Sequence, residues 1–198
     1  MTATIEKPRL QAKYIGEVKD QVIKEFDLTN VSQAPKLAKI VINVAIGRYL
    51  DNQKLKPEIR DTVIATLMKI SGQKPIEIKA KKSISNFKVR EGAPSAFMVT
   101  LRNEKMWHFL DRLISFAIPR IKDFRGLNPK SFDADGNYSM GLTEQAVWPE
   151  INMAEFSFNH GMNINLVFEN SDPRKSLNVL TNLGMPFKQE DKEVTNGK

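Results

Sequence analysis

The side chains best suited to chemistry lie in the stretch 79–102, and the chemistry they suit is the binding of phosphate groups. Its first part, residues 79–92, is termed the basic loop and carries cations, a hydroxyl group and an aromatic ring: Lys81, Lys82, Ser83, Phe87, Lys88 and Arg90. Beyond it, Phe97, Val99 and Leu101 alternate with a polar face that carries Thr100 and Arg102, the period of two that is typical of a strand with one buried face. Because each lysine or arginine that neutralises a phosphate releases condensed counterions, this stretch predicts contact with a nucleic-acid backbone.

The side chains that could act in catalysis are scattered along the chain. The two histidines, His108 and His160, lie far apart in sequence and have no neighbouring nucleophile or third ligand. The sequence lacks the glycine-rich phosphate and dinucleotide motifs and the nucleophile elbow, and it has no cysteine. Polar residues from Asp133 to Glu144 follow the spacing of a calcium loop, but Tyr138 occupies the position that demands glycine. We therefore expect no catalytic residue, no cofactor and no metal.

The length, charge and hydropathy of the whole chain limit the number of domains and the kinds of partner that we expect. The chain has 198 residues, of which 41% are hydrophobic, enough for one large or two small domains with a real core. Its formal net charge of +7 favours polyanionic partners and carries no information about the fold. No apolar stretch approaches the roughly 18 residues of a membrane helix, so we expect a cytoplasmic protein without membrane contact. A basic enzyme or a protein-interaction domain with a cationic loop is the alternative that these numbers leave open.

Local patterns predict helices mixed with one-sided strands. Helices are expected at 8–26, at 57–71 with Gly72 as the cap, from an Asn103 cap to Pro119, and from 173 to Gly184. Strands are expected at about 35–46, 76–80, 97–102, 138–148 and 163–168. This order favours one α+β domain at 9–187 with a mostly antiparallel sheet, helices packed on one face and the other face open for RNA. The polar ends, 1–8 and 188–198, are expected to be disordered, and Arg120 and Arg125 in the loop before 138 are further possible RNA contacts.

Short motifs spread along the chain jointly resemble one known family. They include Pro35-Lys36-Leu37 with Asn43, Ile70-Ser71-Gly72-Gln73-Lys74-Pro75, Ala80-Lys81-Lys82-Ser83, Phe87-Lys88-Val89-Arg90-Glu91-Gly92, Val99-Thr100-Leu101-Arg102, Asp123-Phe124-Arg125-Gly126-Leu127 and Gly136-Asn137-Tyr138. From about 14 to 187, the chain resembles the bacterial form of the large-subunit ribosomal protein five family, whose members bind 5S ribosomal RNA. One turn departs from that pattern, because Arg48 stands where bacterial members usually have an acid, and Ala45 stands where they have glycine.

The resemblance implies a structural role in the large (50S) ribosomal subunit, in the central protuberance. The open face of the sheet would lie on 5S ribosomal RNA, with these residues in contact: Asn43, Gln73, Lys74, Thr100 and Arg102. The basic loop would reach the transfer RNA in the peptidyl site. Further implied partners are 23S ribosomal RNA and, through a bridge to the head of the small subunit, its ribosomal protein thirteen.

Overall fold

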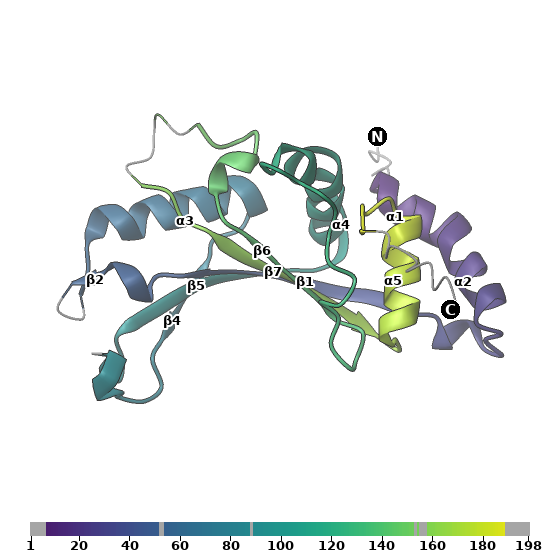
Figure 1. Cartoon of the computed structure of the whole chain (residues 1–198), viewed down its shortest axis with the longest axis horizontal. Helices are drawn as coiled ribbons and strands as arrows, with labels where there is room; N and C mark the ends of the chain where they lie inside the picture. The colour runs from purple at the N-terminus through teal and green to yellow at the C-terminus, as the bar shows by residue number, and fades with distance from the viewer. Residues whose placement is uncertain (1–6, 52–53, 88, 153, 155–157, 189–198) are drawn as a thin grey trace, which may run out of the picture.

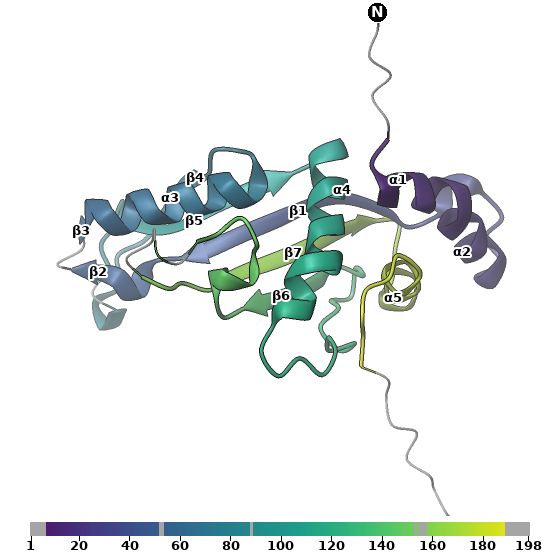
Figure 2. The same cartoon turned by 90° about the horizontal axis from the view of Figure 1, so that it is seen from above.

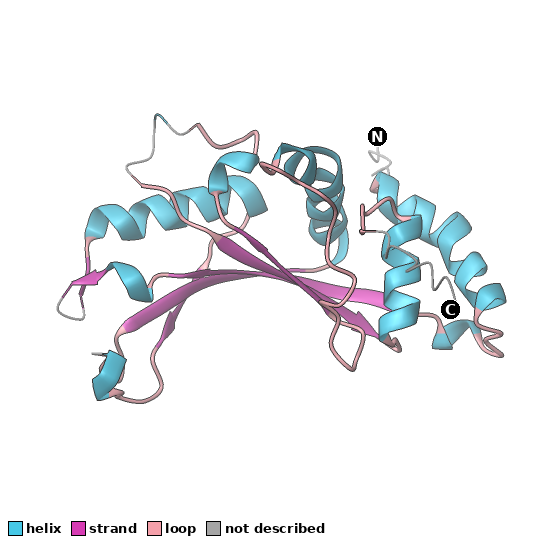
Figure 3. Ribbon diagram, viewed as in Figure 1, coloured by secondary structure: helices cyan, strands magenta, loops and turns pink. Residues whose placement is uncertain are grey.

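The computed structural model describes residues 7–51, 54–87, 89–152, 154 and 158–188. Its centre is a five-stranded antiparallel sheet in the order β4-β5-β1-β7-β6, drawn in magenta in Figure 3. The strands are β1 Lys36–Ala45, β4 Ile76–Lys79, β5 Pro94–Leu101, β6 Tyr138–Leu142 and β7 Met162–Glu169. A separate short ribbon follows β1 and pairs β2 Leu50–Asp51 with β3 Lys54–Leu55. The predicted α+β fold with an antiparallel sheet is confirmed.

Alternation along the strands gives the sheet one apolar face. In the central strand β1, Ile40 and Ile42 are fully buried, whereas Val41 and Asn43 point to the opposite face and are partly exposed. Ile40 lies opposite Leu101 of β5 and Leu166 of β7, so buried residues meet across three strands. The register therefore gathers the buried apolar side chains on one face, while the other face carries polar side chains together with a few partly exposed apolar ones such as Val41 and Met98.

Helices cover the apolar face. Figures 1 and 2 show α3 (Pro57–Ser71) and α4 (Asn103–Arg112) lying over the sheet, while α1 (Arg9–Lys13), α2 (Lys19–Glu25) and α5 (Pro173–Asn182) gather at the end where β1 begins. The bounds of α3 follow from its sequence, because Pro57 suits the first helical turn and Gly72 takes the left-handed conformation at φ +65°. None of the described helices covers the opposite face of the sheet (Figure 1).

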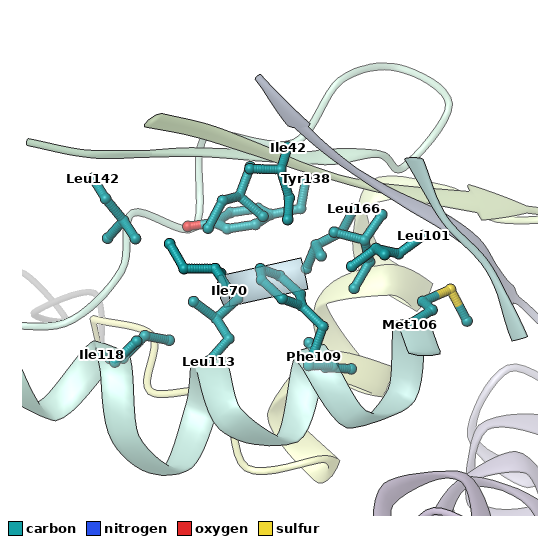
Figure 4. Packing of buried hydrophobic residues seen from close by; sticks show 14 of the residues in the cluster. Ile42, Ile70, Leu101, Met106, Phe109, Leu113, Ile118, Tyr138, Leu142 and Leu166 are labelled. Atoms are coloured by element: carbon teal, nitrogen blue, oxygen red, sulfur yellow. The ribbon is translucent and has the colours of Figure 1, made fainter. Parts of the chain in front are cut away.

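The core fills the space between the sheet and α4. Figure 4 shows Phe109 and Leu113 of this helical segment directed at Leu101, Leu166 and Tyr138 of the sheet. At the neighbouring end, the Tyr14 ring lies 5.5 Å from the Trp107 ring and joins the N-terminal helix to α4. This core fixes one face of the sheet and leaves the other face available for a partner.

Three sequence predictions about element bounds need correction. The helix predicted at 8–26 contains a π-helical turn, Tyr14–Val18, between α1 and α2. Its buried residues recur every fourth position, which drifts by about 40° per step around a regular α-helix, and the wider turn offsets this drift. The predicted Asn103 cap is wrong by one residue, since the extended Arg102 joins β5 directly to α4 as its N-cap.

The strand predicted at 138–148 ends at Leu142. Leu142 lies opposite Met162, the first residue of β7, so the chain beyond it has no strand to pair with. It forms a short 3-10 turn, Gln145–Val147, in which the buried Gln145 side chain donates from Nε2 to the Phe158 carbonyl at 3.0 Å. At the chain ends, 1–6 and 189–198 lie outside the described residues, and the Lys188 N–H donates to the Leu127 carbonyl at 2.9 Å.

Candidate nucleic-acid interface

A band of polar side chains crosses the uncovered face of the sheet, termed here the open face. In the strand register Asn43 of β1 lies opposite Asn163 of β7, and Asn165 of β7 lies opposite Ser139 of β6. Thr100 of β5 pairs with Val41, two residues before Asn43, so its side chain is a diagonal neighbour of Asn43 on the same face. Amide and hydroxyl groups from four adjacent strands therefore share one surface that no described helix covers.

The turn between α3 and β4 brings Gln73 to this band. The Gln73 Nε2 group donates to the Thr100 carbonyl at 3.4 Å, and the Gln73 N–H donates to Ser71 Oγ at 3.2 Å. Lys74 follows in the turn and is exposed, and Arg102 is exposed immediately beyond the end of β5. The structure thus gathers the five residues singled out from the sequence along β1, β5 and the adjoining turn.

Asn43 has an unsatisfied acceptor. Its Oδ1 is buried and accepts no hydrogen bond from any described residue, although the side chain as a whole is partly exposed. Leaving a buried polar atom unpaired costs about 1–3 kcal/mol, a penalty that a ligand with an N–H or O–H donor would remove. Because the atom is buried, an external donor can reach it once the amide side chain turns toward the open face.

The basic loop projects from the sheet beyond β4 and β5 (Figure 1, lower left) on a hydrogen-bonded framework. Ile84 and Val89 exchange backbone hydrogen bonds of 2.8 and 3.2 Å, which close the 3-10 turn Ser85–Phe87. Ser83 supports this framework, because its Oγ accepts the Glu91 N–H at 2.9 Å. A fixed frame therefore presents the side chains at the tip.

The cations of this loop are available to a partner. Lys81, Lys82 and Arg90 are exposed, and the described part of the chain offers them no ion pair; Lys88 lies outside the described residues. Phe87 is 75% exposed, the largest fraction among the exposed large hydrophobic residues. Exposed cations beside an exposed aromatic ring are a combination that suits RNA, since bases stack on aromatic rings while phosphates meet cations.

Arg120 and Arg125 lie apart from both groups. Arg120 lines a hollow with Gly141, Leu142 and Glu144 next to β6, at the opposite edge of the sheet from β4. Arg125 is exposed in the loop that leads toward Leu127. The structure does not bring either arginine to the band on the open face.

Sequence reasoning missed the contribution of β6 and β7 to the band. Asn163 and Asn165 alternate with the buried Ile164 and Leu166, so the same period of two that revealed Thr100 was present in this segment. The pairing of β7 with β1, which places Asn163 beside Asn43, carries no signal in local sequence.

Burial shifts the pKa of titratable side chains in the interior, among them Tyr138 and His160. Burial raises the pKa of the Tyr138 hydroxyl to about 12, and this group donates to the Asn128 carbonyl at 3.3 Å. Burial also lowers the pKa of His160, whose Nδ1 lies 3.2 Å from the Gly161 carbonyl. No group of three or more His, Asp or Glu side chains within the described ranges has the arrangement of a metal site.

Comparison with known proteins identifies the family. A family model described as ribosomal protein L5 matches residues 30–90, and a second model, for the C-terminus of the same ribosomal family, matches residues 94–187. The chain belongs to the ribosomal protein L5 family. Two similar relatives, both called "Large ribosomal subunit protein uL5", are from Geobacter sulfurreducens (46% identity over 91% of this chain and 98% of the relative) and Streptomyces avermitilis (46% over 94% and 99%).

Membership of the L5 family gives the chain a structural, non-enzymatic place in the large ribosomal subunit. A third relative of the same name, from an Anaeromyxobacter species, is 44% identical over 91% of this chain and 98% of its own length. The resemblance inferred from short motifs is therefore confirmed. Among the described residues, no helix is long and apolar enough to span a membrane.

Proposed function

We propose that this member of the L5 family binds 5S ribosomal RNA through the open face of its sheet. The observation that carries the proposal is the set of amide and hydroxyl side chains that β5, β1, β7 and β6 place on this face, flanked by the exposed Lys74 and Arg102. Amide side chains can hydrogen-bond to base edges and sugars, while exposed cations neutralise phosphates. The unpaired Asn43 Oδ1 supports the same assignment, because no described residue donates to it and an RNA donor could do so once the amide turns toward the open face.

The basic loop is assigned a different partner, the transfer RNA in the peptidyl site. Its cations and Phe87 stand on a hydrogen-bonded framework that extends beyond β4 and β5, so they present a second surface beside the open face. In the assembled subunit the protein would also contact 23S ribosomal RNA and help to bridge to ribosomal protein thirteen in the small-subunit head. Arg120, next to β6 at the other edge of the sheet, and the exposed Arg125 are candidates for such additional RNA contacts.

A binding titration tests the central proposal. Gel shifts with 5S RNA and with an RNA duplex of unrelated sequence, each at low and moderate salt, separate specific recognition from general attraction. We expect tighter binding to 5S RNA, and a log–log salt slope of about −0.7 to −0.9 for each phosphate that the protein neutralises. Equal affinity for both RNAs would contradict specific recognition, and a flat salt response would contradict phosphate contact.

A further inference from the structure

A cavity lies where the tip of the basic loop meets one end of the open face. Its volume is about 540 Å³, and four separate segments line it: the end of β1 and its following turn, the basic loop, the end of β6 at Leu142, and the start of β7 with the residues before it. The lining side chains that matter here are Asn43, Arg48, Tyr49, Phe87, His160 and Asn163. We term this space the tip cavity. It joins the two surfaces to which separate RNA partners were assigned above.

One wall of the tip cavity contains Tyr49 and His160, which are the two ends of an aromatic row. The Tyr49 ring lies 5.2 Å from the Phe158 ring, which in turn lies 5.6 Å from the ring of His160. The Tyr49 hydroxyl also donates to the Asn159 carbonyl at 3.2 Å, which anchors the outer end of the row. Since burial lowers the pKa of His160, its imidazole is neutral at pH 7 and this wall carries no charge.

Phe87 also lines the tip cavity, and its ring has no described aromatic partner. The Phe87 side chain is 75% exposed, and the backbone bonds between Ile84 and Val89 fix the turn on which it stands. An exposed phenylalanine on a fixed turn is unfavourable in water and becomes favourable when a flat apolar surface covers it. The exposed Phe87 ring therefore favours a ligand with a planar ring.

Polar and charged side chains that line the tip cavity would fix the orientation of such a ligand. Asn43 and Asn163 lie opposite each other in the strand register and both line the tip cavity. Because Asn43 Oδ1 lacks a donor, a ligand with an exocyclic amino or ring N–H group would satisfy it once the amide turns toward the cavity. Arg48 is exposed at the rim and suits a phosphate attached to that ligand.

We propose that the tip cavity takes one unpaired nucleobase of a bound RNA. The base stacks on Phe87 and faces the Tyr49 row, its amino edge meets the Asn43 and Asn163 amides, and its phosphate meets Arg48. The inference rests on the proposed RNA-binding function and deepens it by assigning a base-specific site. The base can come from 5S RNA or from transfer RNA, and the experiment below separates the two sources.

A variant that fills the space gives the sharpest test. A Cβ placed on Gly47, which lines the tip cavity, meets no atom within 4 Å, so Gly47→Leu adds a side chain there without a clash at its first atom. Gly16→Leu is the matched control, since its added Cβ also meets nothing within 4 Å and it lies in the N-terminal helix. Phe87→Ala removes the stacking ring, and Phe116→Ala removes another exposed ring of the same kind from the segment after α4.

The readout is base-by-base reactivity toward dimethyl sulfate and a carbodiimide. The full chain is bound to 5S RNA in one arm and incorporated into reconstituted ribosomes with peptidyl-site transfer RNA in the other. We expect one unpaired base in one of these RNAs to be protected by the unaltered chain and by both control variants. Gly47→Leu and Phe87→Ala should restore its reactivity, and Phe87→Ala should weaken binding of that RNA about 5- to 150-fold.

The RNA that contains the protected base identifies the source. Unchanged reactivity of every base with Gly47→Leu and Phe87→Ala, in both arms, would overturn the inference while leaving 5S binding intact. Failure of the unaltered chain to bind 5S RNA would instead refute the proposed function, so the two failures are distinguishable.

Discussion

Replacing Arg102 with alanine separates RNA recognition from folding. Arg102 is exposed, and its backbone at φ −137° and ψ 165° is an extended conformation that alanine adopts without strain. Its side chain does not cap α4, and no described acid pairs with it. The free energy of unfolding should therefore change by less than about 0.5 kcal/mol.

The loss in RNA affinity should be much larger. An arginine that forks onto a base contributes about 1–3 kcal/mol, so its loss corresponds to about a 5- to 150-fold increase in the Kd for 5S RNA. If the contact is to phosphate alone, the salt slope should also fall by about one. Filter binding across a salt series measures the affinity and the slope, and urea unfolding measures the stability.

Arg60→Ala is the matched control for this experiment. Arg60 belongs to α3 on the covered side of the sheet, where it pairs with Glu77 at 3.2 Å, an exposed contact worth at most about 1 kcal/mol. It should leave RNA affinity nearly unchanged. If Arg102→Ala lost as much unfolding free energy as binding free energy, Arg102 would be a structural residue and the open-face interface would lose its main cation.

Three further perturbations address the loop, a buried histidine and one turn. Replacing Lys81, Lys82, Lys88 and Arg90 of the basic loop with glutamine should leave urea unfolding and specific 5S binding largely intact, since the described ones are exposed and unpaired. The same change should weaken retention of peptidyl-site transfer RNA in reconstituted ribosomes. Burial lowers the pKa of His160 below its usual 6.5, so the unfolded chain binds a proton more readily than the folded chain, and stability should be fully present above pH 6.5 and fall at lower pH. Urea unfolding at pH 7.5 and pH 5 should show a smaller fall for His160→Gln than for His108→Gln, the control at an exposed site. Asn137→Ala should cost about 1–3 kcal/mol in urea unfolding, because Asn137 Oδ1 accepts the Phe168 N–H at 3.0 Å; an unchanged midpoint would mean that water replaces this acceptor.

Local signals in the sequence were sufficient for most elements. The helix α3 has the predicted bounds because Pro57 begins it and Gly72 caps its end. The alternation of side chains around Asn43 predicted β1. The Asn103 cap was misplaced because β5 runs into α4 without a turn, so the cap position falls on the residue that directly follows the strand. Bounds set by pairing, such as the end of β6 at Leu142, depend on where β7 begins and cannot be read locally.

The candidate interface was only half visible from sequence. Thr100 and Arg102 followed from strand periodicity, whereas Asn43 and Gln73 gained a role only from family resemblance, because a lone amide in a strand or turn has no periodic signal. The part formed by Asn163 came from a long-range pairing between β1 and β7. The band forms only when strands that are distant in sequence pair in the folded sheet.

The placement of β1 in the centre of the sheet affects how the chain is made. Asn43 pairs with Asn163, which is synthesised 120 positions later, and at about 5–20 residues per second this delay lasts roughly 6–24 s. During that time β1 can pair with β5 on one side only, and its other edge exposes unpaired backbone groups between apolar side chains. A nascent chain released before β7 emerges would therefore carry an unpaired central strand, which makes truncated products of this protein prone to aggregation and dependent on early chaperone capture or degradation.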